Sequence, residues 1–250
     1  MTDDLVSMQV SVVSGSRSDR DLLRQAAAAS KMPIDVIETD DISAACRSVA
    51  AGVDLVYLDR ALGTEAVAHV TVAARTVHKP PFTVLLSEAD TDGAFPTDGL
   101  AAKPADLEDA KRLVGRSIHV RLPSRVLVLD DSPTMRSIVR KILLATRFPL
   151  ELTEAGQGSE AIELARKIEF DIVFLDYNLP GLSGLETMAE FKREKRNPTF
   201  VLITSAQDDA VGARARAYGA TFLKKPFFPA DIEAILCSFY GLRALNPQRL

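Results

Sequence analysis

The sequence predicts an α/β protein made of two doubly wound domains, each built on a parallel five-stranded sheet. Two observations carry this prediction. Short β-branched segments alternate with helical patterns through both halves of the chain. The string D-[LI]-V-[YF]-L-D also occurs twice, ending at Asp59 and at Asp176, 117 residues later. This period is far longer than the roughly 20–50 residues of solenoid repeats and indicates duplication of a whole domain.

The first half, residues 1–120, is predicted to hold five strands separated mostly by alanine-rich helical segments. We expect strands at residues 10–15, 34–40, 54–59, 81–88 and 99–104. The segment 89–99, ADTDGAFPTDG, is too rich in glycine and proline to predict a helix between the last two strands. A linker is expected around residues 119–124, where Pro123 disfavours helix, unless the preceding helix extends into it.

The second half, residues 124–241, repeats the order more regularly and leaves a short tail at 242–250. Strands are expected at 125–130, 150–155, 171–176, 199–205 and 221–226, and helices at 132–148, 158–168, 184–195, 207–218 and 230–240. Pro133 near the start of the first helix suits a helix N-terminus. The string 171–176 lacks polar alternation, which is typical of a strand buried on both faces of a parallel sheet.

Composition excludes several classes of protein. Apolar residues make up 47% of the 250 residues, enough for sizeable cores, and no apolar run approaches the roughly 20 residues needed to cross a bilayer. Residues 1–122 carry 13 basic and 18 acidic side chains and the remainder 17 and 16, so neither half offers a basic face for nucleic acid. Cys46 and Cys237 fit reduced structural thiols, and an acidic N-terminus without a signal segment predicts a cytoplasmic protein.

Polar residues follow the strands of the second half at one edge of the predicted sheet, because the carboxyl ends of parallel strands meet there. These residues are Asp130 and Asp131 after the first strand, Asp176 and Asn178 after the third, Thr204 at the fourth and Lys225 at the fifth. Three clustered carboxylates repel one another, and a bound divalent cation relieves that repulsion. Magnesium suits a few carboxylates combined with phosphate oxygens. The residues therefore predict magnesium-dependent phosphoryl transfer, with Asp176 as the nucleophile and with Lys225 and Thr204 contacting phosphoryl oxygens.

The segments VLVLDDSPTMR, FLDYNLPG, ITSA and KKPF resemble the successive motifs of bacterial two-component response-regulator receiver domains. The CheY-like subgroup, which has a flavodoxin-like (βα)5 fold, is the most similar. The resemblance covers about residues 124–241 and implies a role for each matching position. Asp176 would be the phosphoacceptor, Asp130, Asp131 and the Asn178 carbonyl would join it in binding Mg²⁺, Thr204 would be the switch hydroxyl, Lys225 the family's lysine and Phe222 the rotating aromatic. The Lys225–Pro226 peptide bond would be cis, as is usual in that family.

The first half keeps only part of this pattern. Aligning the two halves places Asp59 with Asp176 and Lys103 with Lys225, but Ser14–Gly15 stands where the acidic pair should be. The same alignment matches Leu86 to Thr204 and Leu100 to Phe222. One carboxylate is a poor magnesium site. We therefore expect Asp59 and Lys103 to form a structural ion pair in a degenerate, receiver-like domain.

These observations predict a response regulator that accepts a phosphoryl group from a sensor histidine kinase or histidine phosphotransfer protein and then changes its protein contacts. It would promote its own phosphorylation without being an enzyme with a separate substrate. The segment after Tyr240 is too short for a DNA-binding or catalytic output domain, and neither nucleic acid nor a membrane is an expected partner. Pairing of two copies through the face of the 207–218 helix is a further hypothesis, carried by Asp208, Asp209, Arg214, Arg216 and Lys224.

Three alternatives to this prediction remain at this point. They are a phosphate sink or relay shuttle, an aspartyl-phosphate phosphatase of haloacid-dehalogenase type, and a scaffold without a working site. The phosphatases need D-x-D-x-[TV] at the nucleophile, whereas DYNLP places Asn178 at the position of the second acid. The complete set of site residues in the second half argues against a pure scaffold.

Overall fold

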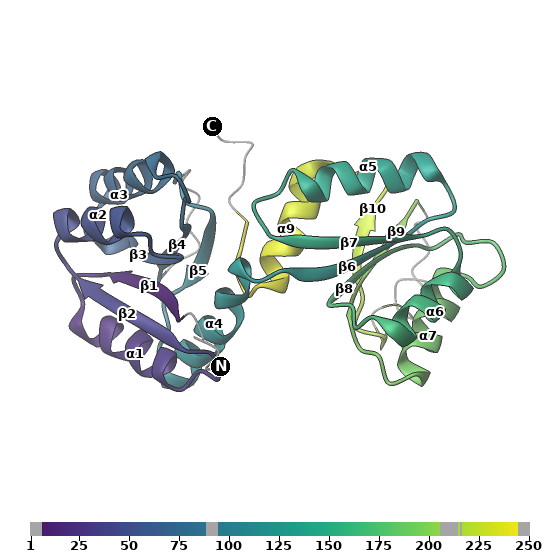
Figure 1. Ribbon diagram of the computed structural model, residues 1–250, viewed down its shortest axis with the longest axis horizontal. Coiled ribbons are helices and arrows are strands. Elements are labelled where there is room, and N and C mark those ends of the chain that lie inside the picture. Colours follow the sequence, from purple (N-terminus) through teal and green to yellow (C-terminus); the bar gives the residue numbers. More distant parts are fainter. Residues whose placement is uncertain (1–6, 89–94, 206–214, 216, 245–250) are drawn as a thin grey trace, which may run out of the picture. The chain divides into compact units, whose positions relative to one another are not determined.

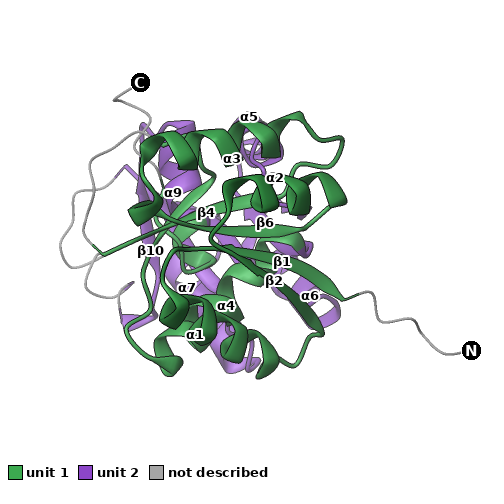
Figure 2. Cartoon of the chain, turned by 90° about the vertical axis from the view of Figure 1, so that its left-hand side faces the viewer, with its two compact units in different colours: residues 1–121, 237–250 green, residues 122–236 purple. Residues whose placement is uncertain are grey.

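The computed structural model describes residues 7–88, 95–205, 215 and 217–244 (Figure 1). The chain divides into two compact units (Figure 2), unit 1 with residues 1–121 and 237–250, and unit 2 with residues 122–236. Each unit contains a parallel five-stranded sheet with alternating helices, which confirms the predicted fold class. Within the described residues, none of the helices combines the length and apolarity needed to cross a membrane.

The sheet of unit 1 has the strand order β2-β1-β3-β4-β5. Its strands are β1 (Met8–Val13), β2 (Ile34–Thr39), β3 (Leu55–Asp59), β4 (Phe82–Ser87) and β5 (Gly99–Ala102). Its helices are α1 (Arg17–Ala28), α2 (Ile42–Ala51), α3 (Thr64–Thr76) and α4 (Leu107–Ser117), with 3-10 turns η1 (Arg60–Leu62) and η2 (Ile118–Arg121). Residues 95–98, within the segment for which no helix was predicted, are not helical, and 89–94 lie outside the described residues.

The sheet of unit 2, in the order β10-β9-β8-β6-β7, repeats the topology of unit 1 when strands are counted within each unit. Its strands are β6 (Ser124–Leu129), β7 (Leu150–Ala155), β8 (Ile172–Asp176), β9 (Thr199–Thr204) and β10 (Thr221–Lys224). Its helices are α5 (Pro133–Leu144), α6 (Gly158–Lys167), α7 (Gly184–Arg193) and α9 (Pro229–Phe239), the last of which ends in unit 1. Most of the helix predicted at 207–218, with Asp208, Asp209, Arg214 and Arg216, lies outside the described residues.

The central strands explain why the repeated string folds as it does. Every residue of β3 and of β8 is buried, as expected for apolar strands covered by helices on both faces. Two positions differ between the two strands: β3 has Leu55 where β8 has Ile172, and Tyr57 where β8 has Phe174. The Tyr57 hydroxyl pairs with Ser117 Oγ of α4, which also donates to the Leu113 carbonyl at 2.6 Å. A buried phenol needs such a partner, so the two units have different cores at matched positions.

Helix α1 and helix α5 begin in the same way. Ser16 and Ser132 are their N-caps, and each side chain accepts a hydrogen bond from the backbone N–H three residues later. Pro133 is the first residue of α5, where it loses no hydrogen bond. These caps fix the turns that follow β1 and β6, which is where the two units carry different polar residues.

The edge strand β5 of unit 1 has a partner from the C-terminal segment of the same unit. Leu100 and Arg243 form an antiparallel bridge, with N–O distances of 3.0 and 2.7 Å. Arg116 of α4 donates to the carbonyl oxygens of Ser238 and Phe239 at 2.7 and 2.9 Å. Leu242 is only 3% exposed and packs against Gly99. Residues 237–243 are therefore an integral part of unit 1.

Candidate functional site

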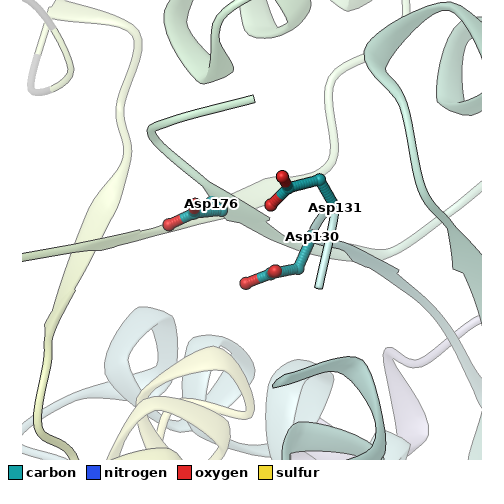
Figure 3. A group of neighbouring side chains, drawn as sticks. All are labelled: Asp130, Asp131 and Asp176. Carbon is teal, nitrogen blue, oxygen red and sulfur yellow. The ribbon is translucent and has the colours of Figure 1, made fainter. Parts of the chain in front are cut away.

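Three carboxylates meet at the carboxyl edge of the unit 2 sheet. Asp130 and Asp131 follow β6, and Asp176 is the last residue of β8. One oxygen from each lies within 4.8 Å of the others, and Figure 3 shows the three side chains extending toward the same region. Asp130 and Asp176 are buried and Asp131 is exposed. The structure thus brings together the three acids that the sequence placed at this edge.

Lys225, which follows β10, completes the cluster. Its Nζ lies 2.9 Å from Asp176 Oδ1 and 3.5 Å from Asp130 Oδ2. The Lys225–Pro226 peptide bond is cis, as predicted. Three carboxylates around one ammonium leave an excess of negative charge in a partly buried space, a distribution that favours binding of a cation.

Burial and neighbouring charges shift the pKa of two groups in this cluster, Asp176 and Lys225. Burial raises the pKa of Asp176 above the usual value of a carboxyl, and the charge of Asp130 raises it further. The Lys225 ammonium and the backbone N–H of Tyr177 act in the opposite direction without cancelling the effect. Burial alone would lower the pKa of Lys225, but its contacts with Asp176 and Asp130 raise it overall. Lys225 is therefore a cation at neutral pH.

The donor set fits Mg²⁺. Magnesium takes hard oxygen ligands and usually combines one or two carboxylates with water and phosphate oxygens. Asp130, Asp131 and Asp176 offer only oxygen atoms. A divalent cation would relieve the repulsion by Asp130 that adds to the effect of burial on the pKa of Asp176. These three residues of unit 2 could therefore hold Mg²⁺ through carboxylate oxygens.

The remaining predicted residues lie on the neighbouring strands or the loop after β8. Thr204 ends β9, is 5% exposed, and its carbonyl accepts a hydrogen bond from Lys225 N at 2.9 Å. Phe222 of β10 is partly buried against the unit 2 core and pairs with Leu202. Asn178 is exposed two residues beyond β8. Thr204 thus lies at the strand end next to Lys225, while Phe222 lies two residues before the end of β10.

Two residues near the acids were missed by the sequence analysis. Arg136 of α5 donates to the Asp130 carbonyl oxygen at 2.7 Å. Gly184, the first residue of α7, lies so close to the end of β8 that a Cβ there would be 2.5 Å from the Asp176 carbonyl oxygen. The D-D-S-x-x-M-R spacing could have indicated the arginine, because a side chain four residues after the cap faces back toward the strand end. No comparable signal marks Gly184.

The matching edge of unit 1 is saturated with hydrogen bonds. Lys103 Nζ lies 3.0 Å from Asp59 Oδ1 and 3.1 Å from Asp19 Oδ2. Asp59 Oδ1 also accepts from Ala61 N at 2.8 Å, and its Oδ2 accepts from Ser14 Oγ at 2.7 Å. The ion pair between Asp59 and Lys103 therefore exists, and Ser14 donates to Asp59 from the position that Asp130 occupies in unit 2.

The strand register corrects one match between the halves. Asp59 pairs with Leu86, and Asp176 pairs with Ile203. Lys103 N donates to the Ser87 carbonyl just as Lys225 N donates to that of Thr204. The counterpart of Thr204 is therefore Ser87, and matching it to Leu86 was wrong by one residue. An apolar run carries no internal mark of register, which only pairing with neighbouring strands fixes. Unit 1 keeps a buried hydroxyl and lacks the acidic pair and the aromatic residue.

The two aspartates of each repeated string have different roles. Asp54 and Asp171 precede β3 and β8 at the opposite edge of each sheet, where their carboxylates accept from the backbone N–H of Gln9 and Arg125 at 3.1 and 2.8 Å. These bonds satisfy donors at the start of β1 and β6. The first acid of the string is thus structural in both units, and only the last one lies at the candidate site.

Comparisons with known proteins agree with this geometry for unit 2. Residues 126–236 match the family model of the response regulator receiver domain. The transcriptional regulatory protein PdtaR of Mycobacterium tuberculosis is 34% identical over 130 residues, 50% of this chain and 62% of that protein. The nitrate/nitrite response regulator protein NarP of Escherichia coli is 35% identical over 82 residues, 33% of this chain and 38% of that protein. The chain therefore spans less than two thirds of these curated relatives.

A solved structure of a putative two-component system response regulator/GGDEF domain protein covers 92% of this chain and 96% of its own, with 23% identity and a TM-score of 0.57. At this identity the likeness concerns the fold alone. The family model, by contrast, matches a range of residues that includes the three acids, Thr204 and Lys225. Residues 126–236 of the chain are therefore similar to the response regulator receiver domain in sequence as well as in fold.

Proposed function

We propose that the protein is a response regulator whose Asp176 accepts a phosphoryl group in a magnesium-dependent reaction. The observation that carries this proposal is the meeting of Asp130, Asp131 and Asp176 within 4.8 Å, with Lys225 Nζ 2.9 Å from Asp176 Oδ1. Magnesium, when bound, would supply charge neutralisation for the phosphoryl oxygens. The role of Asp176 in this proposal is that of the nucleophile, and Asp130 and Asp131 are the further ligands, helped by the Asn178 carbonyl.

The chemistry asked of the chain is an in-line displacement. A carboxylate oxygen of Asp176 forms a bond to phosphorus, while the P–N bond to a phosphohistidine breaks and the imidazole leaves with the electron pair. Lys225 is positioned to neutralise charge on the transferred group, and the Thr204 hydroxyl to donate a hydrogen bond to it. Asp176 is 6% exposed, and this burial would limit the access of water to the acyl phosphate.

Phosphorylation would then shift unit 2 between two states. In this proposal Thr204 moves toward the phosphoryl group and Phe222 turns further into the space that opens, which alters the surface around β10 and α9. A change from 1:99 to 99:1 in favour of the active state requires about 5.5 kcal/mol of preference. The output is a change in protein contacts, and pairing of two copies through this surface is one form it can take.

The donor in this proposal is a sensor histidine kinase or a histidine phosphotransfer protein. Both free cysteines, Cys46 and Cys237, are compatible with a reducing compartment, and we place the exchange in the cytoplasm. The protein promotes its own phosphorylation and has no separate substrate. Unit 1 takes no phosphoryl group, because both oxygens of Asp59 are already occupied by Lys103, Ala61 and Ser14.

The test is labelling of the full chain with acetyl phosphate and magnesium on a phosphate-affinity gel. Asp176→Asn should abolish the shifted band, and the matched variant Asp59→Asn should retain it. Labelling that survives in Asp176→Asn, or that disappears in Asp59→Asn, would contradict the assignment. Omitting magnesium or adding a chelator should also abolish labelling.

A phosphate sink or relay shuttle uses the same site and differs in the fate of the phosphoryl group. Rapid loss of the label to a second histidine protein would favour the shuttle over a regulator that acts through altered contacts. An aspartyl-phosphate phosphatase is disfavoured, because the residue two positions after Asp176 is the exposed amide Asn178, which cannot act as the second acid. Steady hydrolysis of a phosphate ester would reverse that ranking.

A further inference from the structure

Arg136 holds the turn that carries the acidic pair. It is the fourth residue of α5, and its side chain is 19% exposed. Its Nη1 donates to the Asp130 carbonyl oxygen at 2.7 Å and reaches the Asp131 carbonyl oxygen at 3.5 Å. Its Nε contacts Glu154 Oε2 of β7 at 3.3 Å. One planar guanidinium thus ties two consecutive main-chain carbonyls to the neighbouring strand.

The rest of Asp130 is also fixed, so that one oxygen is left facing the site. Ser132 N donates to Asp130 Oδ1 at 2.9 Å, and Asp130 N donates to the Ala155 carbonyl at 3.3 Å. Asp130 Oδ2 is the oxygen that faces Lys225. With its main-chain carbonyl held by Arg136, the carboxylate has little freedom to turn away from Asp176.

Unit 1 provides an internal comparison. Arg20 is the fourth residue of α1 and donates to the Ser14 carbonyl oxygen, as Arg136 does to that of Asp130. The anchor differs in part. Glu38, at the position of Glu154, pairs with Arg24 at 2.9 Å, whereas Glu154 contacts Arg136 at 3.3 Å as well as Arg140, the counterpart of Arg24, at 3.5 Å. The arginine therefore holds the same turn in a unit that has no acids on it. In unit 1 this contact has only a structural role.

We propose that Arg136, anchored by Glu154, is a positioning residue for metal binding. It fixes the backbone of Asp130 and Asp131 so that both carboxylates face the third acid before a cation arrives. This inference rests on the proposed magnesium-dependent function. Residues that orient metal ligands through hydrogen bonds typically change metal affinity about 10–100-fold when they are replaced.

Because Arg136 is charged, the direction of the change in Mg²⁺ affinity on its replacement distinguishes a positioning role from a purely electrostatic one. A guanidinium near a metal site repels the cation, so its charge alone predicts that removal tightens magnesium binding. Positioning predicts the reverse. Arg136→Met removes both charge and contacts, whereas Arg136→Lys keeps the charge but cannot hold two carbonyls and a glutamate in one plane.

The experiment is calorimetric titration of Mg²⁺ into the full chain without a phosphodonor. Thermal unfolding of each variant is measured separately without Mg²⁺. Arg136→Met and Arg136→Lys should both weaken binding, by about tenfold or more for Met. Glu154→Gln should weaken it less. The matched control Arg20→Met should leave Mg²⁺ affinity unchanged while lowering the stability of unit 1.

Equal or tighter Mg²⁺ binding by Arg136→Met would overturn the inference and leave the proposed function intact. If that variant does not fold, Arg136→Lys and Glu154→Gln decide the question, and wild-type affinity in both also overturns it. Absence of Mg²⁺ binding by the wild-type chain would instead overturn the proposed function, and this inference with it.

Discussion

Two matched strand ends in one chain hold their aspartates in different surroundings, and the loops that follow them differ in length. Helix α7 begins at Gly184, eight positions after Asp176, whereas α3 begins at Thr64, five positions after Asp59. The shorter connection is the 3-10 turn η1, and Asp59 is its N-cap. Its carboxylate accepts hydrogen bonds from a backbone N–H and a serine and pairs with a lysine, while that of Asp176 pairs with Lys225 beside two further acids. The two strand ends therefore differ in the hydrogen bonds that each carboxylate accepts, as well as in the residues that surround it.

The sharpest test of this difference is removal of each lysine. Lys103→Met leaves the 1% exposed Asp59 carboxylate without its cation and should cost unit 1 about 3–5 kcal/mol. Lys225→Met should cost unit 2 less. The Lys225 side chain is 25% exposed, so water can better solvate the Asp176 carboxylate once the ammonium is removed. Hydrogen exchange with mass spectrometry resolves the two units.

The double variant Lys103→Met with Asp59→Asn is the control for that experiment. It removes the buried charge together with its partner and should recover part of the lost stability. If Lys103→Met and Lys225→Met destabilise their units equally, the saturated edge of unit 1 is not what supports its fold.

Gly184 offers a second test, of intermediate size. A Cβ at this position would lie 2.5 Å from the Asp176 carbonyl oxygen and 3.1 Å from Tyr177 Cα, so Gly184→Ala must displace the backbone beside Asp176. We expect a loss of about 1–3 kcal/mol in unit 2 and weaker Mg²⁺ binding in the titration.

Gly115→Ala is a control change in unit 1. Gly115 lies inside α4, and a Cβ at this position would meet nothing within 4 Å, so alanine should stabilise that helix by about 0.5–1 kcal/mol. Unchanged stability and Mg²⁺ affinity in Gly184→Ala would show that the close approach of α7 to β8 is easily relieved.

Tyr57 should make the stability of unit 1 depend on pH in the alkaline range, whereas unit 2 has Phe174 at the matched position. Burial raises the pKa of its phenol, which the hydrogen bond with Ser117 only partly offsets. An acid whose pKa is raised by folding contributes stability that is complete below its unfolded pKa of about 10 and is lost as pH rises above it. At neutral pH, Tyr57→Phe should cost unit 1 about 1 kcal/mol.

The cost of Tyr57→Phe should shrink by up to about 1.4 kcal/mol for each pH unit above that point, because only the wild-type chain gains an ionised phenol on unfolding. Denaturant titrations at neutral and alkaline pH measure this change. Tyr218→Phe in unit 2 should leave the profile of unit 1 as it is. A cost that stays constant with pH would mean that Tyr57 ionises in the folded unit.

The smallest expected effect is the pH dependence of Mg²⁺ binding. Protons and Mg²⁺ compete for the same oxygens, and the pKa of Asp176 lies above that of an ordinary carboxyl. Apparent Mg²⁺ affinity should therefore fall as pH is lowered from about 8 toward 5, with protons released on binding. Titration in buffers of different ionisation enthalpy measures that release. An affinity independent of pH would show that Asp176 is already fully ionised throughout this range.

Sequence reasoning predicted most of the strands within one or two residues, and it predicted that Asp130, Asp131 and Asp176 would meet. Parallel topology alone brings those acids to one edge, so local pattern was sufficient. It failed where long-range packing decides. Ser87 could be told from Leu86 only through pairing with β3 and β5. Gly184 could be recognised only through the position of α7.

The antiparallel bridge between Leu100 and Arg243 has a consequence for the design of truncated fragments of this chain. The family match ends at residue 236, which invites a truncation there, but Cys237, Tyr240 and Leu242 are buried side chains of unit 1. A fragment ending at residue 121 would lose them and would expose the backbone of β5, an open edge on which other chains can add strands. Expression of unit 1 by itself should therefore yield aggregates unless residues 237–243 are supplied, either as a peptide or by circular permutation.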